Sequence, residues 1–166
     1  MTTDALKPAR YEDGRAILLA GLRRHHEFEE SVRTIPEQWQ ELRSLGAMPG
    51  QIGANTYGVI CGEHPGGFEY LCGAEVESFA GLPDNMGRMR LTPQHYAVFL
   101  HSGPIANLRG TWQRIFKDWL PGSGFDSAQR PDFEVYDQRF DPRTRQGVVE
   151  IWIAITRDRT SGVPVA

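Results

Sequence analysis

Cysteine is scarce in this sequence: only Cys61 and Cys72 occur among its 166 residues. Neither has a neighbouring Cys or His in the spacing of a zinc site, so we expect no structural zinc. The two cysteines flank GEHPGGFEYL, a segment that is typical of a hairpin. Either a disulfide joins them across the hairpin, or both remain buried thiols, which is the usual state in a cytoplasmic protein.

Long apolar runs are also absent. No stretch of 18 apolar residues occurs, so the sequence predicts no transmembrane helix and no membrane association. The first residues, MTTDALKPARYEDG, are polar and include acids, unlike the start of a secretory signal peptide. We therefore expect a cytoplasmic protein.

The sequence has no excess of basic residues. Lys and Arg number 18 against 21 Asp and Glu, which gives a net charge of −3 with neutral histidines. Nucleic-acid-binding domains usually carry a basic face, and the segment before residue 15 is too short for a helix-turn-helix. We therefore expect no direct nucleic-acid binding.

The common catalytic signatures are missing as well. The sequence contains no Gly-rich phosphate loop, no GxSxG elbow and no HExxH helix, which argues against the usual nucleotide, acyl-transfer and zinc-hydrolase chemistries. The adjacent His25 and His26 point to opposite sides of a strand and make a poor chelate. The sequence thus predicts no cofactor and no metal ion.

What the sequence does contain is one order of elements, used twice. Hydrophobic residues make up 40% and charged residues 23% of the chain, ordinary values for one globular domain, here residues 1–166. The first repeat, about 15–77, indicates strand, helix, strand, strand, with Thr34 as the helix cap and Glu37 in the capping-box position. The expected strands are 15–22, 56–64 and 68–78, and the expected helix lies within 34–50.

The second repeat, about 95–156, has the same order. Its expected strands are 95–103, 132–140 and 147–155, and its expected helix is 105–120. The apolar residues of the two helices align at a constant offset of 73 residues, which marks the same buried face on each. The aligned pairs are Val32 and Ile105, Ile35 and Leu108, Trp39 and Trp112, and Leu42 and Ile115. The predicted fold class is α+β, a tandem β-α-β-β repeat with pseudo-twofold symmetry, mostly antiparallel sheet and a crossover loop at 78–94.

One acid lies in the most strand-like stretch of the chain, GVVEIWIAI at 147–155. Alternate side chains of a strand share a face, so Glu150 lies with Trp152, whereas the opposite face is aliphatic and must be core. Either the face with Glu150 is turned to water, or it lines a cavity that combines large aromatic rings with one polar group. In such a cavity Glu150 would lack a permanent counter-charge and would attract a cation, with help from the aromatic faces.

Two further tryptophans, Trp39 and Trp112, hold equivalent positions on the two helices. They either fill the core or wall a central cleft between the repeats. Tyr136 and Phe68 are further candidates for residues that line this cleft. His101, near the end of a strand, is either a polar lining residue or a histidine whose hydrogen bonds are satisfied locally.

Several stretches together resemble the GyrI-like domain, the effector-binding domain of bacterial transcription activators. They are FEYLCGAEV in the first half and YAVFLHSGPIANLRGTWQRIFKDWLPGSGF, RPDFEVYDQRF and VVEIWIAI in the second. The resemblance spans almost the whole chain and implies two SH2-like β-α-β-β units around a central ligand cleft. It also implies that Glu150 and Trp152 meet cationic, aromatic ligands there. Ala154 replaces a proline that is usual in the family, which affects the strand end more than the pocket.

Members of this family that regulate transcription usually carry a helix-turn-helix of the AraC or MerR kind, and we expect this chain to be a stand-alone member without one. We predict an effector- or drug-binding protein for an aromatic, cationic or amphipathic small molecule, with a regulator or a topoisomerase as the candidate protein partner. The first alternative is an enzyme, a hydrolase of strained, cyclopropane-containing genotoxins in which Glu150 is the catalytic residue that activates water. The second alternative is a DNA gyrase inhibitor that acts through its surface.

Overall fold

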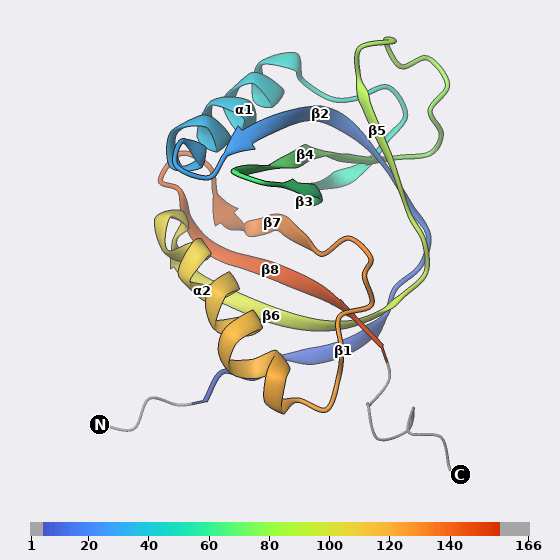
Figure 1. Cartoon of the computed structure of the whole chain (residues 1–166). Helices are drawn as coiled ribbons and strands as arrows, with labels where there is room; N and C mark the ends of the chain where they lie inside the picture. Colours follow the sequence, from blue (N-terminus) through green and yellow to red (C-terminus); the bar gives the residue numbers. More distant parts are fainter. Residues whose placement is uncertain (1–4, 157–166) are drawn as a thin grey trace.

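Eight antiparallel strands form one sheet in the order β1-β6-β8-β7-β3-β4-β2-β5 (Figure 1). The computed structural model describes residues 5–156. The strands are β1 (Arg10–Asp13), β2 (Ile17–Glu27), β3 (Gln51–His64), β4 (Gly67–Val76), β5 (Gly87–Leu91), β6 (His95–Pro104), β7 (Phe133–Asp141) and β8 (Gln146–Ile155). The predicted α+β class with antiparallel sheet is confirmed.

The sheet is symmetric about its central pair, β3 and β7. Outward from that pair, one half runs β3-β4-β2-β5 and the other runs β7-β8-β6-β1. A helix follows the first long strand of each half, α1 after β2 and α2 after β6, as the predicted tandem repeat requires.

Two strands were not predicted, β1 and β5, and they exchange halves. Each precedes the first long strand of its own half in sequence, yet β1 pairs with β6 and β5 pairs with β2. The segment 78–94 is therefore more than a crossover loop, because it contains β5. Both strands are short edge strands of four and five residues, too short to show a clear alternation in the sequence.

The first helix, α1, spans Ser31–Leu45 and begins three residues before the predicted cap, Thr34. The backbone carbonyl of Glu30 accepts the first helical hydrogen bonds, from the N–H groups of Arg33 and Thr34 at 2.9 and 3.0 Å. The Thr34 hydroxyl lies 2.6 Å from His26 Nδ1 instead. The predicted capping role of Thr34 is thus wrong, because Thr34 lies inside the helix, where its hydroxyl contacts His26 of β2 and donates to the Glu30 carbonyl at 3.2 Å.

The second helical segment is continuous over the predicted range but changes pitch along its length. It consists of a 3₁₀ turn η1 (Ile105–Asn107), α2 (Leu108–Arg114), a π-helical turn η2 (Ile115–Trp119) and a 3₁₀ turn η3 (Leu120–Gly122). Among the helices of residues 5–156, none is long and apolar enough to cross a membrane.

Side chains alternate between two faces of the sheet. On the helix face, Val149, Ile151 and Ile153 of β8 pack in one cluster with Leu108 and Ile115 of the second helical segment. The corresponding cluster in the first half joins Leu42 of α1 to residues of β2 and β4. The far face holds a separate core that includes Leu19, Leu71, Val98, Phe133 and Val135. The predicted aliphatic core face of β8 is therefore confirmed, and it is the face under α2.

The helices do not bury all of their matched apolar residues. Leu42, Leu108 and Ile115 are buried, but Val32 is 76% exposed, and Trp39 is only half-buried. The expectation that the aligned residues form one fully buried face is wrong for Val32. Figure 1 shows the reason: α1 and α2 lie over different halves of the sheet, and a cleft separates their facing sides.

The two cysteines lie on neighbouring strands but do not bond. Cys72 on β4 pairs with Gly58, whereas Cys61 on β3 falls in an irregular register between Ile60 and Gly62. Both are free thiols, and Cys72 is the buried one. Of the two alternatives that the sequence left open, the structure shows no disulfide.

Candidate functional site: a cleft between the two helices

A cleft of about 1030 Å³ opens between α1 and α2 above the centre of the sheet. Its volume suits a drug-sized organic molecule. One wall comes from α1, with Ile35 and Trp39, and the other from the second helical segment, with Trp112 and Phe116. The floor comes from β3, β4 and β7, and its residues include Thr56, Ile60, Phe68, Tyr70, Glu134 and Tyr136.

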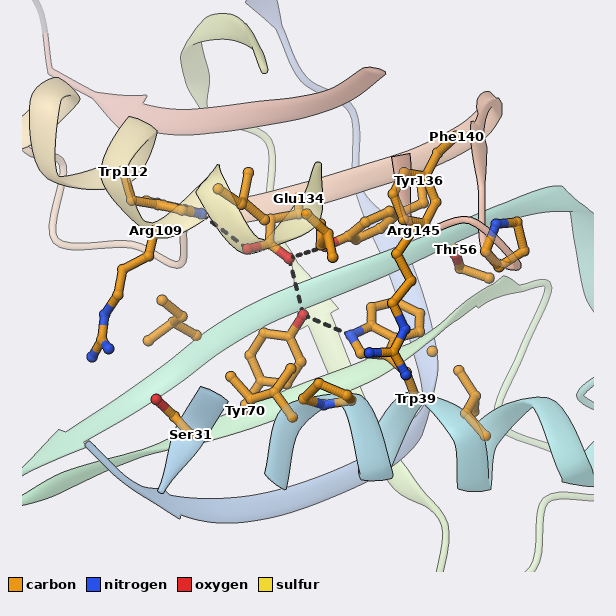
Figure 2. A pocket seen from close by; sticks show the side chains of 18 of the residues that line it. Ser31, Trp39, Thr56, Tyr70, Arg109, Trp112, Glu134, Tyr136, Phe140 and Arg145 are labelled. Atoms are coloured by element: carbon orange, nitrogen blue, oxygen red, sulfur yellow. Dashed lines mark hydrogen bonds between the residues drawn. The ribbon is translucent and has the colours of Figure 1, made fainter. Parts of the chain in front are cut away.

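A buried carboxylate, Glu134, is the polar centre of the floor (Figure 2). Its Oε1 accepts hydrogen bonds from the hydroxyls of Tyr136 at 2.7 Å and Tyr70 at 2.9 Å. Its Oε2 accepts one from Trp112 Nε1 at 2.9 Å. Trp39 Nε1 donates in turn to the Tyr70 hydroxyl at 3.2 Å. The network therefore joins both helices to the floor through one acid.

The local sequence explains why Glu134 reaches this face. Glu134 and Tyr136 are two residues apart on β7, so they share the helix face, whereas Phe133 and Val135 point to the far-face core. Gly58 on β3 pairs with Glu134, and a Cβ at this position would lie 2.0 Å from the Tyr70 hydroxyl and 2.7 Å from Glu134 Oε1. Only glycine at position 58 leaves room for the bond between Tyr70 and Glu134.

Glu134 has donors but no counter-ion. Among residues 5–156, no Lys, Arg or His forms an ion pair with it. Burial raises the pKa of Glu134 above its ordinary value, although the hydrogen bonds from Tyr136, Tyr70 and Trp112 oppose that rise. Burial and the charge of Glu134 also raise the pKa of Tyr70 and of Tyr136 well above 10.0, so both hydroxyls stay protonated donors.

Aromatic rings surround this acid. The ring centroids of Trp39 and Tyr136 are 4.9 Å apart in an edge-on arrangement, and those of Trp112 and Phe116 are 6.1 Å apart and nearly parallel. These pairs leave ring faces and edges along the cleft, which suit an aromatic or cationic guest.

The rim of the cleft is richer in cations than in anions. Arg43, Arg109, Lys117 and Arg145 line it, against Glu63 and Asp137, and Asp137 is already paired with Arg139 at 2.7 Å. Arg109 stands on α2, and Arg145 stands in the turn between β7 and β8 (Figure 2). In the described part of the chain, neither side chain has an ion-pair partner.

Glu150, the acid expected to anchor the ligand, lies on the far face instead. It is 8% exposed, and Arg10 binds both of its oxygens at 3.1 Å. Arg139 and the Trp152 indole add hydrogen bonds of 2.9 Å each. Burial alone would raise the pKa of Glu150, but these donors outweigh it and lower the pKa. The expectation that this acid lacks a counter-charge is wrong, and Glu150 is not a lining residue of the cleft.

The structure divides the remaining candidates. Trp39, Trp112, Tyr136 and Phe68 line the cleft. Trp152 belongs to the far face, where its ring stacks on Phe133 at 5.4 Å.

His101 lies outside the cleft lining as well. It is buried, with Nδ1 2.7 Å from the Thr111 hydroxyl and Nε2 3.1 Å from the Pro104 carbonyl. Its hydrogen bonds are therefore satisfied locally, which was one of the two roles that the sequence left open.

Two residues of the network, Glu134 and Tyr70, were missed by the sequence analysis. The available signal was the pair of Glu134 and Tyr136 at strand spacing, which places an acid beside a residue already expected in the cleft. Among residues 5–156, the group of His and Glu side chains that could hold a metal ion lies outside the lining of the cleft.

Comparisons with known proteins agree with this architecture. A match to the transcriptional regulator BrlR of Pseudomonas aeruginosa has 36% identity over 102 residues, which are 60% of this chain and 37% of that regulator. The match thus spans little more than a third of the length of that relative. The solved structure of SAV2435 bound to tetraphenylphosphonium has a TM-score of 0.71 and 16% identity, and the likeness covers 89% of this chain and 93% of that one.

A second solved structure, the integron cassette protein VCH_CASS2 from the mobile metagenome of Vibrio cholerae, has a TM-score of 0.65 and 17% identity. This likeness covers 91% of this chain and 97% of that one. At these identities, both likenesses establish the fold alone. A family model, Cass2, described as integron-associated effector binding protein, matches residues 13–155. Since that match spans most of the sequence, the chain belongs to the family of integron-associated effector-binding proteins, which share the GyrI-like fold.

Proposed function

We propose that this protein binds an aromatic, amphipathic organic cation in the cleft between α1 and α2, and that it does so in the cytoplasm. The observation that carries the proposal is Glu134, a buried acid with three hydrogen-bond donors and no ion-pair partner among residues 5–156. The GyrI-like relatives are effector-binding domains, which supports a ligand in this cleft.

The buried charge of Glu134 favours a cationic ligand. A buried carboxylate without a counter-ion costs several kcal/mol, of which hydrogen bonds recover part. A cation that enters the cleft supplies the missing partner, in surroundings where water screens the attraction weakly. The faces of Trp39 and Trp112 add cation–π attraction of roughly 0.5–2 kcal/mol each.

The rim supports an amphipathic rather than a purely cationic ligand. Four basic side chains line the cleft, and Arg109 and Arg145 have no ion-pair partner in the described part of the chain. Their charge opposes a bare cation at the mouth but favours a polar or anionic group there. The ligand that fits both ends has its cation and rings toward Glu134 and its polar end toward solvent.

The relatives support the same reading. SAV2435, which has the same fold, is seen with tetraphenylphosphonium, a cation surrounded by four phenyl rings. The match to the regulator BrlR supports a regulatory use of ligand binding, in which a partner protein responds to the occupied cleft.

Calorimetric titration with tetraphenylphosphonium tests the proposal, with tetraphenylborate as an anion of the same shape in potassium-free buffer. We expect the phosphonium to bind and the borate to bind at least about tenfold more weakly, a difference of about 1.4 kcal/mol. Glu134→Gln removes the charge but keeps a similar shape and should abolish most of that preference. Glu150→Gln is the matched control and should retain it. Equal affinity for the two ions in the unaltered protein would refute the proposal.

A further inference from the structure

Three potential metal ligands meet on the far face of the sheet, at the end of the β3–β4 hairpin. They are His25 of β2, His64 of β3 and Glu69 of β4. One ligand atom from each lies within 4.8 Å of the other two. From this geometry we infer a binding site for a divalent transition-metal ion of the zinc, copper or nickel kind, independent of the cleft.

The strand register produces this cluster. His25 pairs with Glu69 across β2 and β4, and His64 pairs with Gly67 across β3 and β4. All three side chains therefore project from three adjacent strands on one face. In the sequence His25 has only His26 as a neighbouring histidine, and His26 points to the helix face. The partners of His25 come from other strands, which the local sequence does not reveal.

Gly67 gives the two imidazoles room to approach each other. A Cβ at this position would lie 2.8 Å from His25 Cε1 and 2.9 Å from His25 Nε2. The His25 ring occupies that space, and its centroid is 5.7 Å from the His64 ring centroid. The histidines thus converge over a gap in the side-chain layer.

The present contacts need only small changes to accept an ion. His64 Nε2 lies 3.8 Å from Glu69 Oε1, and His25 Nε2 lies 3.0 Å from Glu27 Oε1. Zinc binds imidazole nitrogen and carboxylate oxygen at about 2.0–2.2 Å, so its tetrahedral ligands lie about 3.4 Å apart. His25 and His64 are exposed. Rotation of their side chains can therefore shift the ring nitrogens by about 1 Å and bring the ligand atoms to that separation.

The donor set selects the class of metal. Two imidazoles and a carboxylate suit zinc, copper or nickel, whereas calcium and magnesium prefer oxygen ligands. Glu27 is placed to add a fourth ligand, because its carboxylate already contacts His25. Arg23 is the competitor, since its Nε lies 3.8 Å from Glu69 Oε2, and a bound ion must replace that weak pair.

Titration of the untagged protein with ZnCl₂ by calorimetry tests the site, with Co²⁺ absorption as a spectroscopic check of coordination. We expect one ion to bind per chain and to raise the Tm by roughly 5–10 °C at a hundredfold excess over Kd. His25→Gln and His64→Gln should each weaken binding at least about tenfold and remove the Co²⁺ bands.

Two control variants keep the result interpretable. His95→Gln removes a half-buried histidine that pairs with Asp13 outside the cluster, and Cys61→Ser removes the half-buried thiol of β3. Both should bind Zn²⁺ as the unaltered protein does. The proposal is overturned if no ion binds, if His64→Gln and His95→Gln bind equally well, or if Cys61→Ser alone abolishes binding.

Discussion

Glu134 and Glu150 lie on adjacent strands, one residue out of register, and therefore on opposite faces of the sheet. Glu134 pairs with Ile151, and Glu150 pairs with Val135. This offset gives the two acids different partners, because Glu134 meets only neutral donors whereas Glu150 meets two arginines. One acid is left available to a ligand cation, and the other ties β8 to β1 and β7.

The structural role of Glu150 can be measured. Glu150→Gln should lower the free energy of unfolding by about 1–3 kcal/mol at pH 7, because it removes charge-assisted hydrogen bonds to Arg10 and Arg139. The folded-state pKa of Glu150 is lowered, so its contribution is present above the unfolded pKa and is lost as pH falls through the folded pKa. Urea unfolding at a series of pH values should show the full deficit of the variant at pH 7 and a steadily smaller deficit as the medium becomes more acidic than the ordinary pKa of glutamate. Glu12→Gln, which removes the other partner of Arg10, should cost less because that pair is exposed.

The positions of the two acids show which parts of the candidate site could be predicted from the sequence and which could not. Strand alternation correctly placed Val149, Ile151 and Ile153 in the core, because period-two patterns depend only on neighbours in the chain. The error was to look for the cavity on the other side of β8. The cleft lies on the helix face, and Glu134 reaches it because its side chain alternates with those of Phe133 and Val135 along β7. The register of β7 against β8, which no single strand reveals, puts Glu150 on the opposite face. Arg10 is 140 residues from Glu150 in sequence, so the counter-charge was equally invisible.

The repeat was predictable for a related reason. Matching apolar spacing in two helices survives in the sequence at a fixed offset, as in Trp39 and Trp112, and it indicates two equivalent units. The exchange of β1 and β5 between the halves leaves no such mark, because edge pairing depends on how the halves are placed in space. The width of the cleft, which leaves Val32 exposed, is likewise a property of the assembled sheet.

The charge of Glu134 predicts a pH dependence of ligand affinity. Because burial raises the pKa of Glu134, the acid gains its proton at a higher pH than an exposed glutamate. We expect the affinity for tetraphenylphosphonium, which does not titrate, to be constant at alkaline pH and to fall as pH drops through that raised pKa. The Glu134→Gln variant should bind weakly with little pH dependence. Parallel pH profiles for the two proteins would mean that another group is responsible.

The two wall tryptophans should differ in their effect on that profile. Trp112 donates directly to Glu134, whereas Trp39 donates to the Tyr70 hydroxyl. Trp112→Phe keeps an aromatic wall but removes a donor that lowers the pKa of Glu134, so the pH at which binding is lost should move upward. Trp39→Phe should leave this pH nearly unchanged. The same titration measures both, and identical shifts would contradict the direct role of the Trp112 indole.

The basic rim predicts a preference between two dyes that share one ring system. Rhodamine B carries a free carboxylate, and rhodamine 6G carries an ester in its place. If Arg109 and Arg145 face the outward end of the ligand, Arg109→Gln and Arg145→Gln should each weaken the binding of rhodamine B by roughly two- to fivefold, the range for an exposed ion pair. Neither change should weaken rhodamine 6G. Fluorescence anisotropy measures both dyes, and an equal loss for the two would show that the arginines do not sense the carboxylate.

Asp132, just before β7, predicts a second pH effect that concerns stability alone. Its Oδ1 accepts a hydrogen bond of 2.8 Å from the Ala154 N–H, and burial raises its pKa to about 7. Because the folded pKa exceeds the unfolded value, the unfolded chain releases this proton first as pH rises. Stability should therefore decline between about pH 4 and pH 7 and then level off. Asp132→Asn keeps the acceptor but cannot ionise, so it should be more stable than the unaltered protein by up to about 4 kcal/mol at pH 8 and nearly equal to it at pH 4.

Asp137→Asn provides the opposite sign, because Arg139 lowers the pKa of Asp137 and its loss should destabilise the fold at pH 8. Urea unfolding of the three proteins between pH 4 and pH 8 measures these differences in stability. An Asp132→Asn variant that is less stable than the unaltered protein at pH 8 would show that the ionised carboxylate is favoured at this position.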